Sequence, residues 1–319
     1  MRFTLRQLSY FVAAGETGSV TRAAELVNIS QPSVSAAISH LETELGVQIF
    51  VRQHAQGLSL TTPGKRLLRA AKESLRAAYE LYDVANAAGS IVSGPINVGS
   101  FRTFSSLIMP ELWRGFIAKY PDAQMVVTEG SEAELLEGLR SARIDIALTY
   151  QLNLTPDMSF QSLVEMPSYV LLAADHRFAT RSSVRLEELA DEPFILLDLP
   201  LSRQYFLSMF EQRSITPRIV AETASPSTLR SYVGAGLGFS MLTVRPVNMM
   251  AENGRPLAYV ELEGNTAPMV MGLACLKDMR RPRIVDAFEA HCREVISADH
   301  IPGMRGTESG PSRVIADEV

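Results

Sequence analysis

Apolar residues recur at spacings of three and four near the start of the chain, and this spacing predicts three amphipathic helices. The first helix is expected to end near residues 15–18, and a break at residues 28–29 separates the other two. The third helix is predicted to begin with Ser30 as its N-cap and with Pro32 in its first turn, because both residue types are favoured there. Its buried stripe consists of Val34, Ala37, Ile38 and Leu41.

The opposite face of the third helix carries short polar side chains, and such a face suits the major groove of DNA. Two short strands, predicted at residues 47–52 and 58–60, form a wing, with Arg52 at a phosphate or in the minor groove. The pattern indicates a winged helix-turn-helix, against the alternative of an αα-hairpin that binds no DNA. The residues predicted to contact DNA are Arg22, Ser30, Gln31, Pro32, Ser33, Ser35, Ser39, His40 and Arg52.

Further apolar, small and turn-forming residues of this region recur together in a known family. They are Leu8, Phe11, Ala23, Ala24, residues 30–35, Ile38, Leu41, Glu42, Leu45, Gly46, Phe50, Arg52, Leu60, Thr61, Thr62 and Gly64. With them, residues 1–65 resemble the winged helix-turn-helix of the LysR-type transcriptional regulators, and the length and layout extend the resemblance to nearly the whole chain. Members often have Arg or Lys where His40 stands. Phosphate contact from this helix is therefore expected to be weaker than usual, or to depend on pH through His40.

A long helix is predicted from Pro63 to Asn86, because apolar residues follow one another at alternating spacings of three and four. Its seam consists of Leu68, Ala71, Leu75, Ala78, Tyr82 and Ala85, and its expected outer residues are Lys72, Glu73, Arg76 and Glu80. An amphipathic helix packed on its own domain is the alternative. Resemblance to the family's linker helix favours a coiled-coil seam, and implies a dimer, or a tetramer overall, on an inverted repeat of double-stranded DNA.

From Pro95 onward, short apolar runs alternate with helical patterns, which predicts parallel strands flanked by helices. The predicted strands are residues 96–99, 125–128, 144–148, 169–172, 194–197, 238–242 and 269–276. The predicted helices are residues 107–120, 131–141, 202–212, 225–235 and 284–296. This part resembles the family's effector domain, which implies two α/β lobes like those of a periplasmic binding protein.

The predicted fold class is thus an all-α winged helix-turn-helix domain followed by a two-lobed α/β domain. The expected boundaries are residues 1–62 for the first domain, 63–90 for the linker helix and 91–300 for the effector domain. By the resemblance, residues 94–165 and 268–298 form lobe I and residues 168–265 form lobe II. Residues 301–319 are expected to be a disordered tail.

Ligands of open α/β sheets bind beyond the carboxyl ends of the strands. The candidate effector residues at those ends and at the helix starts are Ser100, Phe101, Arg102, Thr103, Thr128, Gly130, Ser131, Thr149, Tyr150, Ser202, Arg203, Gln204 and Ser225. Three of them, Ser131, Ser202 and Ser225, are predicted N-caps, and the free N–H groups of helix starts favour anions. Together with Arg102 they predict a small anionic effector, a carboxylate.

Composition changes this picture little. Residues 1–86 contain nine Lys and Arg against seven Asp and Glu, while the whole chain has a net charge of −5. A weakly basic head on an acidic body is compatible with DNA binding. No apolar run approaches the roughly 20 residues of a membrane span, and Met1 leads directly into a helical pattern without a signal peptide. A cytoplasmic protein with no membrane partner is therefore expected.

Other chemistry is scarce in the sequence. Cys275 and Cys292 lack CxxC spacing and are expected to be reduced core residues. We find no metal-ligand spacing and no catalytic constellation, so we predict no metal, no cofactor and no enzyme activity.

These observations predict a sequence-specific transcriptional regulator that is controlled by a small effector bound between two α/β lobes. The resemblance also implies RNA polymerase as a partner. Two alternatives stay open: a regulator of the same fold that responds to oxidation of Met or Cys, and a solute-binding protein, for which residues 1–86 have no use.

Overall fold

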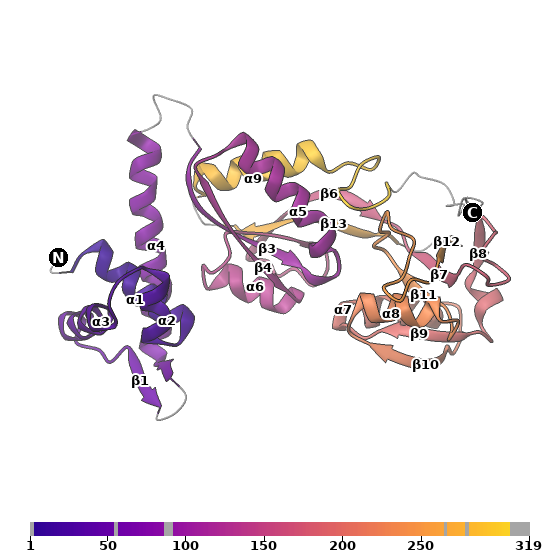
Figure 1. The fold of residues 1–319 in the computed structure, drawn as a ribbon, viewed down its shortest axis with the longest axis horizontal. Helices are drawn as coiled ribbons and strands as arrows, with labels where there is room; N and C mark the ends of the chain where they lie inside the picture. Colours follow the sequence, from indigo (N-terminus) through magenta and orange to yellow (C-terminus); the bar gives the residue numbers. More distant parts are fainter. Residues whose placement is uncertain (1–2, 54–56, 86–91, 265–266, 278–280, 307–319) are drawn as a thin grey trace.

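The computed structural model describes residues 3–53, 57–85, 92–264, 267–277 and 281–306. Its N-terminal part consists of α1 (Leu5–Thr17), α2 (Val20–Leu26), α3 (Gln31–Leu45), β1 (Phe50–Gln53), β2 (Gly57–Leu60) and α4 (Thr62–Ala85). Figure 1 shows these elements at one end of the molecule, with α4 between the other N-terminal elements and the α/β part. The predicted helix-turn-helix and its wing are confirmed.

The three helices of the head, residues 3–60, share one core. The apolar stripe of α3 is buried throughout, as its spacing predicts. It meets Phe11 of α1, whose ring lies edge-on to that of Phe50 at a centroid distance of 5.8 Å. Gly18 and Gly46 end α1 and α3 in the left-handed conformation, with φ of 62° and 66°, which glycine adopts at little cost.

The wing begins later than predicted, at Phe50 rather than at residue 47. A side chain of α3 explains the difference, because Glu42 Oε1 accepts the backbone N–H groups of Ile49 at 2.8 Å and Phe50 at 3.1 Å. Those groups are thus bonded to a carboxylate where a strand partner would otherwise be needed. Gly64 completes the junction, because a Cβ there would lie 2.2 Å from the Ile49 carbonyl oxygen.

Ser30 occupies the N-cap position of α3, as predicted, but its side chain makes no cap hydrogen bond. Its hydroxyl lies 2.8 Å from that of Ser33 and so bonds a side chain in place of a backbone N–H. Pro32 does lie in the first turn.

The first half of helix α4 packs on the head. This part of the helix therefore agrees with the alternative of an amphipathic helix packed on its own domain. Ala71 is buried in the head core, and Leu68 and Leu75 pack against the same core. The expectation that Lys72 and Arg76 lie outside was wrong, because both are largely buried and paired, with Glu16 at 2.6 Å and Asp145 at 3.3 Å. The side chains of Tyr82 and Ala85, and all of Asn86, lie outside the described residues.

Lobe I contains a five-stranded sheet in the order β4-β3-β5-β13-β6, in which β3 is parallel to both neighbours and β13 antiparallel to both. The prediction of parallel strands is confirmed for β3, β4 and β5 and was wrong for β13. In Figure 1, α5 and α9 cover one face and α6 the other. The elements are β3 (Gly94–Phe101), α5 (Arg102–Lys119), β4 (Ala123–Gly130), α6 (Glu132–Arg140), β5 (Ile146–Tyr150), β6 (Met158–Met166), β13 (Met269–Leu276) and α9 (Arg283–Val295).

Lobe II lies between β6 and β13 in the chain. Its four-stranded sheet has the order β11-β7-β12-β8, and the parallel pair β9 and β10 is joined to the segment before β11 through Phe194 and Phe239. The elements are β7 (Tyr169–Ala173), β8 (Ser183–Arg185), η2 (Leu186–Leu189), β9 (Pro193–Leu197), α7 (Pro200–Glu211), β10 (Arg218–Thr223), α8 (Pro226–Gly234), β11 (Ser240–Leu242) and β12 (Leu257–Glu263).

Several element ends differ from the predictions. Helix α5 begins at Arg102, before the expected residue 107, and α7 begins at Pro200, so that Leu199 and not Ser202 is its N-cap. The pattern also missed β6, β8, β10 and β12, of which β10 has a short apolar run but mostly exposed residues.

The expected disordered tail begins with an ordered segment. Ile301 and Met304 are buried, and the Arg305 N–H donates to the Arg245 carbonyl at 2.9 Å. The expectation was therefore wrong for residues 301–306, and residues 307–319 lie outside the described chain. Within the described chain, no helix has the length and apolar character to span a membrane.

Candidate DNA-binding surface and effector cavity

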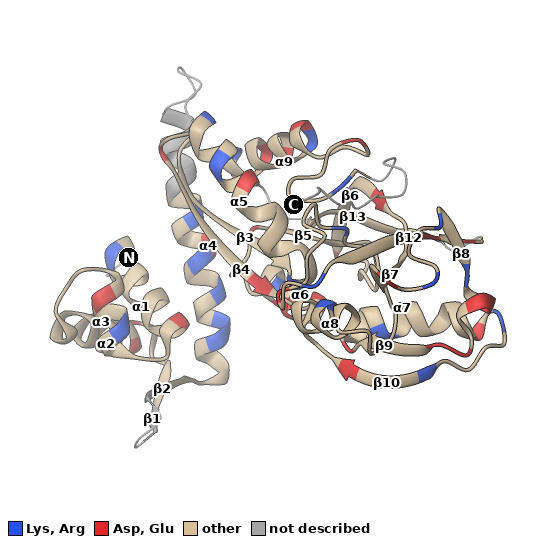
Figure 2. Cartoon of the chain, turned by 45° about the vertical axis from the view of Figure 1, so that its right-hand side comes forward, with Lys and Arg blue, Asp and Glu red and all other residues tan. Residues whose placement is uncertain are grey.

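The outer face of α3 is polar and open to solvent. Ser35 is half-buried, and the exposed residues of this face include Gln31, Pro32, Ser33, Ser39 and His40. Arg22 is exposed on α2, and Arg52 lies in β1 opposite Leu58, with its side chain outside the described residues. Because α3 contains no Lys or Arg, its own face offers hydrogen bonds rather than charge. Figure 2 shows Lys and Arg spread along α4.

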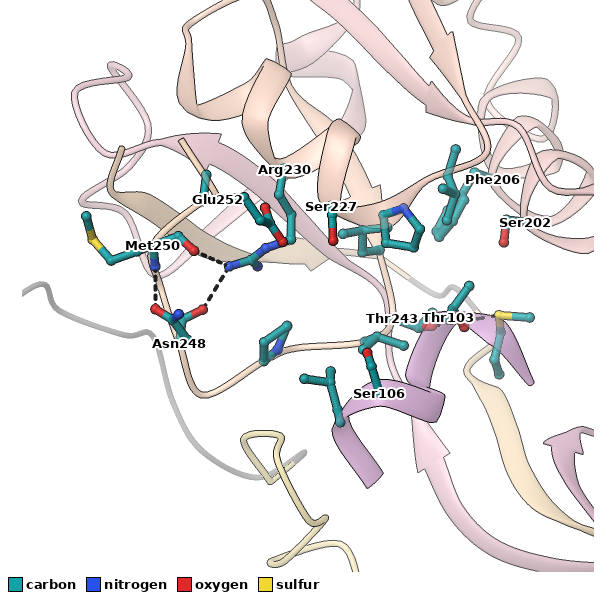
Figure 3. A pocket seen from close by; sticks show the side chains of 18 of the residues that line it. Thr103, Ser106, Ser202, Phe206, Ser227, Arg230, Thr243, Asn248, Met250 and Glu252 are labelled. Atoms are coloured by element: carbon teal, nitrogen blue, oxygen red, sulfur yellow. Dashed lines mark hydrogen bonds between the residues drawn. The ribbon is translucent and has the colours of Figure 1, made fainter. Parts of the chain in front are cut away.

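A cavity of about 210 Å³ lies between the two lobes. Lobe I contributes Thr103, Ser106 and Leu107 from α5, with Tyr150 from the end of β5 and Met269 from β13. The lining residues of lobe II and of the segment after β11 are Leu197, Ser202, Phe206, Pro226, Ser227, Arg230, Leu242, Thr243, Val244, Pro246, Asn248, Met250, Ala251 and Glu252. Figure 3 shows side chains of both lobes around this space.

Three of the thirteen candidate effector residues, Thr103, Tyr150 and Ser202, line the cavity. The other ten are not among its lining residues: Ser100, Phe101, Arg102, Thr128, Gly130, Ser131, Thr149, Arg203, Gln204 and Ser225. The structure therefore brings together only part of the predicted set, and the reasons differ between residue types.

The predicted basic residues are already neutralised. Arg102 lies 3.2 Å from Glu134 with 51% of its side chain exposed. Arg203 is paired with Asp198 at 2.8 Å and with Glu222 at 3.1 Å. Neither guanidinium offers an unpaired charge to a ligand in the cavity, so the sequence argument for an anion loses this support.

The predicted serine caps are also occupied. Ser131 forms a capping box with Glu134, and the Ser225 hydroxyl accepts the Thr228 N–H at 3.2 Å. Ser100 and Thr149 are fully buried, and their hydroxyls have no partner among the described residues. Tyr150 is different, because its hydroxyl reaches the cavity wall and lies 3.0 Å from that of Thr243. Burial raises the pKa of Tyr150 to about 12, so the phenol stays neutral at physiological pH.

Arg230 is the one basic residue among the described cavity-lining residues, and it was not among the predicted site residues. It lies on the buried face of α8 with Leu229 and Val233, and only 6% of it is exposed. Its Nη1 donates to the Tyr259 hydroxyl at 2.6 Å, and its Nη2 donates to the carbonyls of Asn248 and Met250 at 2.8 Å each. The available signal was an arginine on the apolar face of a predicted helix, because such residues are rarely buried without a reason.

Comparison with known proteins places both halves of the chain. Residues 5–65 match the model of the bacterial regulatory helix-turn-helix protein, lysR family, and residues 90–297 match the LysR substrate binding domain. The chain belongs to the LysR family of transcriptional regulators. This LysR-family chain is 35% identical over 254 residues to the HTH-type transcriptional regulator YvbU of Bacillus subtilis (strain 168), covering 80% of the chain and 84% of YvbU.

Solved structures of the LysR family share the fold. HinK of Pseudomonas aeruginosa, a LysR family transcriptional regulator, is 36% identical with a TM-score of 0.64, over 92% of this chain and 99% of that one. A full-length OxyR variant of Pseudomonas aeruginosa is 25% identical with a TM-score of 0.73, over 92% of this chain and 98% of that one.

The two cysteines of this LysR-family regulator lie in the core of lobe I, as predicted. Burial raises the pKa of Cys275 to about 11 and holds the pKa of Cys292 well above its usual value. Because the thiolate is the reactive form, both groups are poorly suited to react with an oxidant. In the described chain, no group of three or more His, Cys, Asp or Glu side chains is placed to hold a metal ion.

Proposed function

We propose that this LysR-family DNA-binding regulator is controlled by a small molecule that binds in the cavity between the two lobes. The observation that supports the proposal is the lining, because α5 and β5 of lobe I and α7 and α8 of lobe II all contribute to it. A ligand that contacts both lobes favours the arrangement in which both sets of contacts form. The angle between the lobes then depends on occupancy.

The head is proposed to read double-stranded DNA through the exposed polar face of α3. Gln31 and Ser33 lie at the start of that helix, where recognition helices contact base edges. The absence of Lys and Arg from α3 assigns sequence readout to this face. Phosphate contacts are proposed for Arg22 and Arg52.

Self-association is proposed to bring two heads to an inverted repeat. Lobe I exposes Trp113 of α5 and Val126 of β4, and lobe II exposes Val220 of β10 and Leu237 after α8. Exposed apolar side chains on both lobes favour contacts between copies of the chain. In this proposal, two chains pair through the second half of α4, and two such dimers join through the lobes to form a tetramer. A change in the angle between the lobes would then alter the spacing of the heads and the contact with RNA polymerase.

Footprinting on the DNA upstream of the protein's own gene, over a salt series, tests this function. We expect protection of an inverted repeat, with binding that weakens as salt rises because phosphate contacts release counterions. Equal affinity for random DNA would contradict specific readout. A footprint that ligands of the cavity leave unchanged would contradict control by an effector.

Control by oxidation is the second candidate, and the buried thiols argue against it. Treatment of the protein with hydrogen peroxide, followed by mass measurement and DNA binding, separates the two. We expect the intact mass and the footprint to stay unchanged at peroxide levels that oxidise an exposed thiol.

A further inference from the structure

We propose that Arg230 is the charge partner of the effector, and that the effector is a small organic monocarboxylate. The inference rests on the proposed function, because it concerns the ligand of the same cavity. It replaces Arg102, which a surface carboxylate already neutralises.

The hydrogen bonds of Arg230 hold its guanidinium in place without neutralising it. A guanidinium has five N–H groups and keeps its positive charge in proteins. Three of these groups donate, and their acceptors are the Tyr259 hydroxyl and the carbonyls of Asn248 and Met250, all neutral. Nε has no hydrogen-bond partner among the described residues and is not among the fully buried atoms, and Arg230 lines the cavity. The Nε–H group is therefore available to a ligand.

Two further arginines lie near Tyr259, the phenol that Arg230 contacts. The Arg245 guanidinium lies 5.6 Å from the centre of the Tyr259 ring. Arg305 also acts on this tyrosine: burial raises the pKa of Tyr259, and the three arginines oppose that rise. A buried positive charge is costly unless an anion pairs with it. The Arg230 guanidinium, whose acceptors are neutral, therefore favours a negatively charged ligand.

The other lining residues limit the ligand to one charge and a short body. Glu252 is the one acidic side chain among the described lining residues, and it is exposed and forms no ion pair with Arg230. Arg230 is the one basic side chain among the described lining residues, so the lining matches a single carboxylate. Apolar walls come from Leu107, Phe206 and Leu242, and the volume of about 210 Å³ leaves little room beyond them. Figure 3 shows Thr103, Ser106 and Thr243 grouped away from the Arg230 guanidinium, where a polar group at the far end of the ligand would lie.

Thermal shift and calorimetric titration of the full-length protein test the inference. The probes are acetate to hexanoate, lactate and benzoate, each compared with its primary amide, which has the same shape without the charge. We expect at least one acid to bind and its amide to bind roughly ten- to a hundredfold more weakly, because hydrogen bonds to a charged group are worth that much. An acid and its amide that bind equally would overturn the inference, as would a panel in which no acid binds.

Two variants locate the charge. Arg230→Gln should weaken acid binding by roughly ten- to a hundredfold while leaving amide binding nearly unchanged. Arg203→Gln, whose ion pairs lie outside the cavity, is the matched control and should bind the acid as the native protein does. Acid binding by Arg230→Gln at native affinity would overturn the inference. The comparison of acid with amide needs no variant, so it holds even where Arg230→Gln fails to fold.

The footprint distinguishes this inference from the function on which it rests. Acids that bind through Arg230 but leave the footprint unchanged would support the inference and contradict effector control. Amides that bind as well as the acids and change the footprint would contradict the inference but support effector control.

Discussion

Two buried arginines of this protein face opposite electrostatic situations. Arg76 of α4, with 16% of its side chain exposed, lies 3.3 Å from the Asp145 carboxylate. Arg230 of α8 is buried more deeply and has only neutral acceptors. The first charge is balanced within the protein, and the second is the charge that we propose the effector pairs with. Buried charge thus holds a joint in one region and, in our proposal, binds a ligand in the other.

The joint at Arg76 connects the linker helix to lobe I. Asp145 precedes β5, and its other oxygen accepts the backbone and side-chain N–H groups of Asn97 at 2.8 Å and 3.0 Å. One helical turn away, Lys72 pairs with Glu16 of α1. Head, linker helix and lobe I therefore meet through complementary pairs around a cavity of about 480 Å³. We propose that a change in the lobes is transmitted to the head through these contacts.

Asp145→Asn should have the largest effect on stability. The substitution removes the carboxylate that lies beside Arg76, and loss of one member of a buried pair costs about 3–5 kcal/mol. Partial exposure of this pair reduces the expected cost to about 2–3 kcal/mol. Urea denaturation measures it, and Glu111→Gln, at an exposed pair with Arg114, should cost less than about 0.5 kcal/mol. Equal costs for the two variants would remove the distinction between a structural pair and a surface pair.

Gln31→Ala tests the DNA-binding face of α3, which contacts neither Arg76 nor Arg230. We expect a loss of about 1–3 kcal/mol in the preference for specific over random DNA, because a side chain that contacts base edges is removed. The stability of the protein should hardly change, since Gln31 is exposed. Competition binding with operator and random DNA measures the preference. Equal losses on both kinds of DNA would assign Gln31 to phosphate contact.

His291→Gln extends the comparison of the two arginines to a buried histidine. Like Arg230, His291 has a neutral hydrogen-bond partner, but unlike an arginine it can lose its proton and become neutral. Its Nε2 lies 3.1 Å from the Leu112 carbonyl in the core of lobe I, and burial lowers its pKa. The folded protein thus binds fewer protons here than the unfolded chain. Stability from this group should be present above a pH of about 6.5, and should be lost as the pH falls through the unfolded value toward the folded one.

In His291→Gln this part of the pH dependence should disappear, at a cost of about 1 kcal/mol at pH 7 for the altered hydrogen bond. Denaturation at a series of pH values from neutral to acidic measures the slope. A variant with the native slope would show that other groups cause the acid sensitivity.

Arg102→Ala should have the smallest effect. Its pair with Glu134 is exposed, and such pairs contribute little, here less than about 0.5 kcal/mol. We expect acid binding and the ligand response of the footprint to stay as in the native protein. Loss of the ligand response in Arg102→Ala would place the ligand at the residues predicted from the sequence, and would contradict the role proposed for Arg230.

Local pattern was sufficient for the head and for much of the α/β part. The spacing of Val34, Ala37, Ile38 and Leu41 predicted the buried face of α3 correctly. The capping box at Ser131 could also be read from the sequence, because Glu134 follows at the spacing that the motif requires. These features depend on residues within one or two helical turns of each other.

The sequence by itself determined the family, the helix-turn-helix and the alternation of strands and helices, because these depend on short-range spacing. Only the tertiary structure decided which charges are balanced. The partner of Arg102 lies 32 residues away, and the Asn97 that holds Asp145 lies 48 residues from it. Arg230 differs from both because the fold surrounds it with carbonyls and a phenol, and no local rule predicts which atoms a chain brings together over such distances.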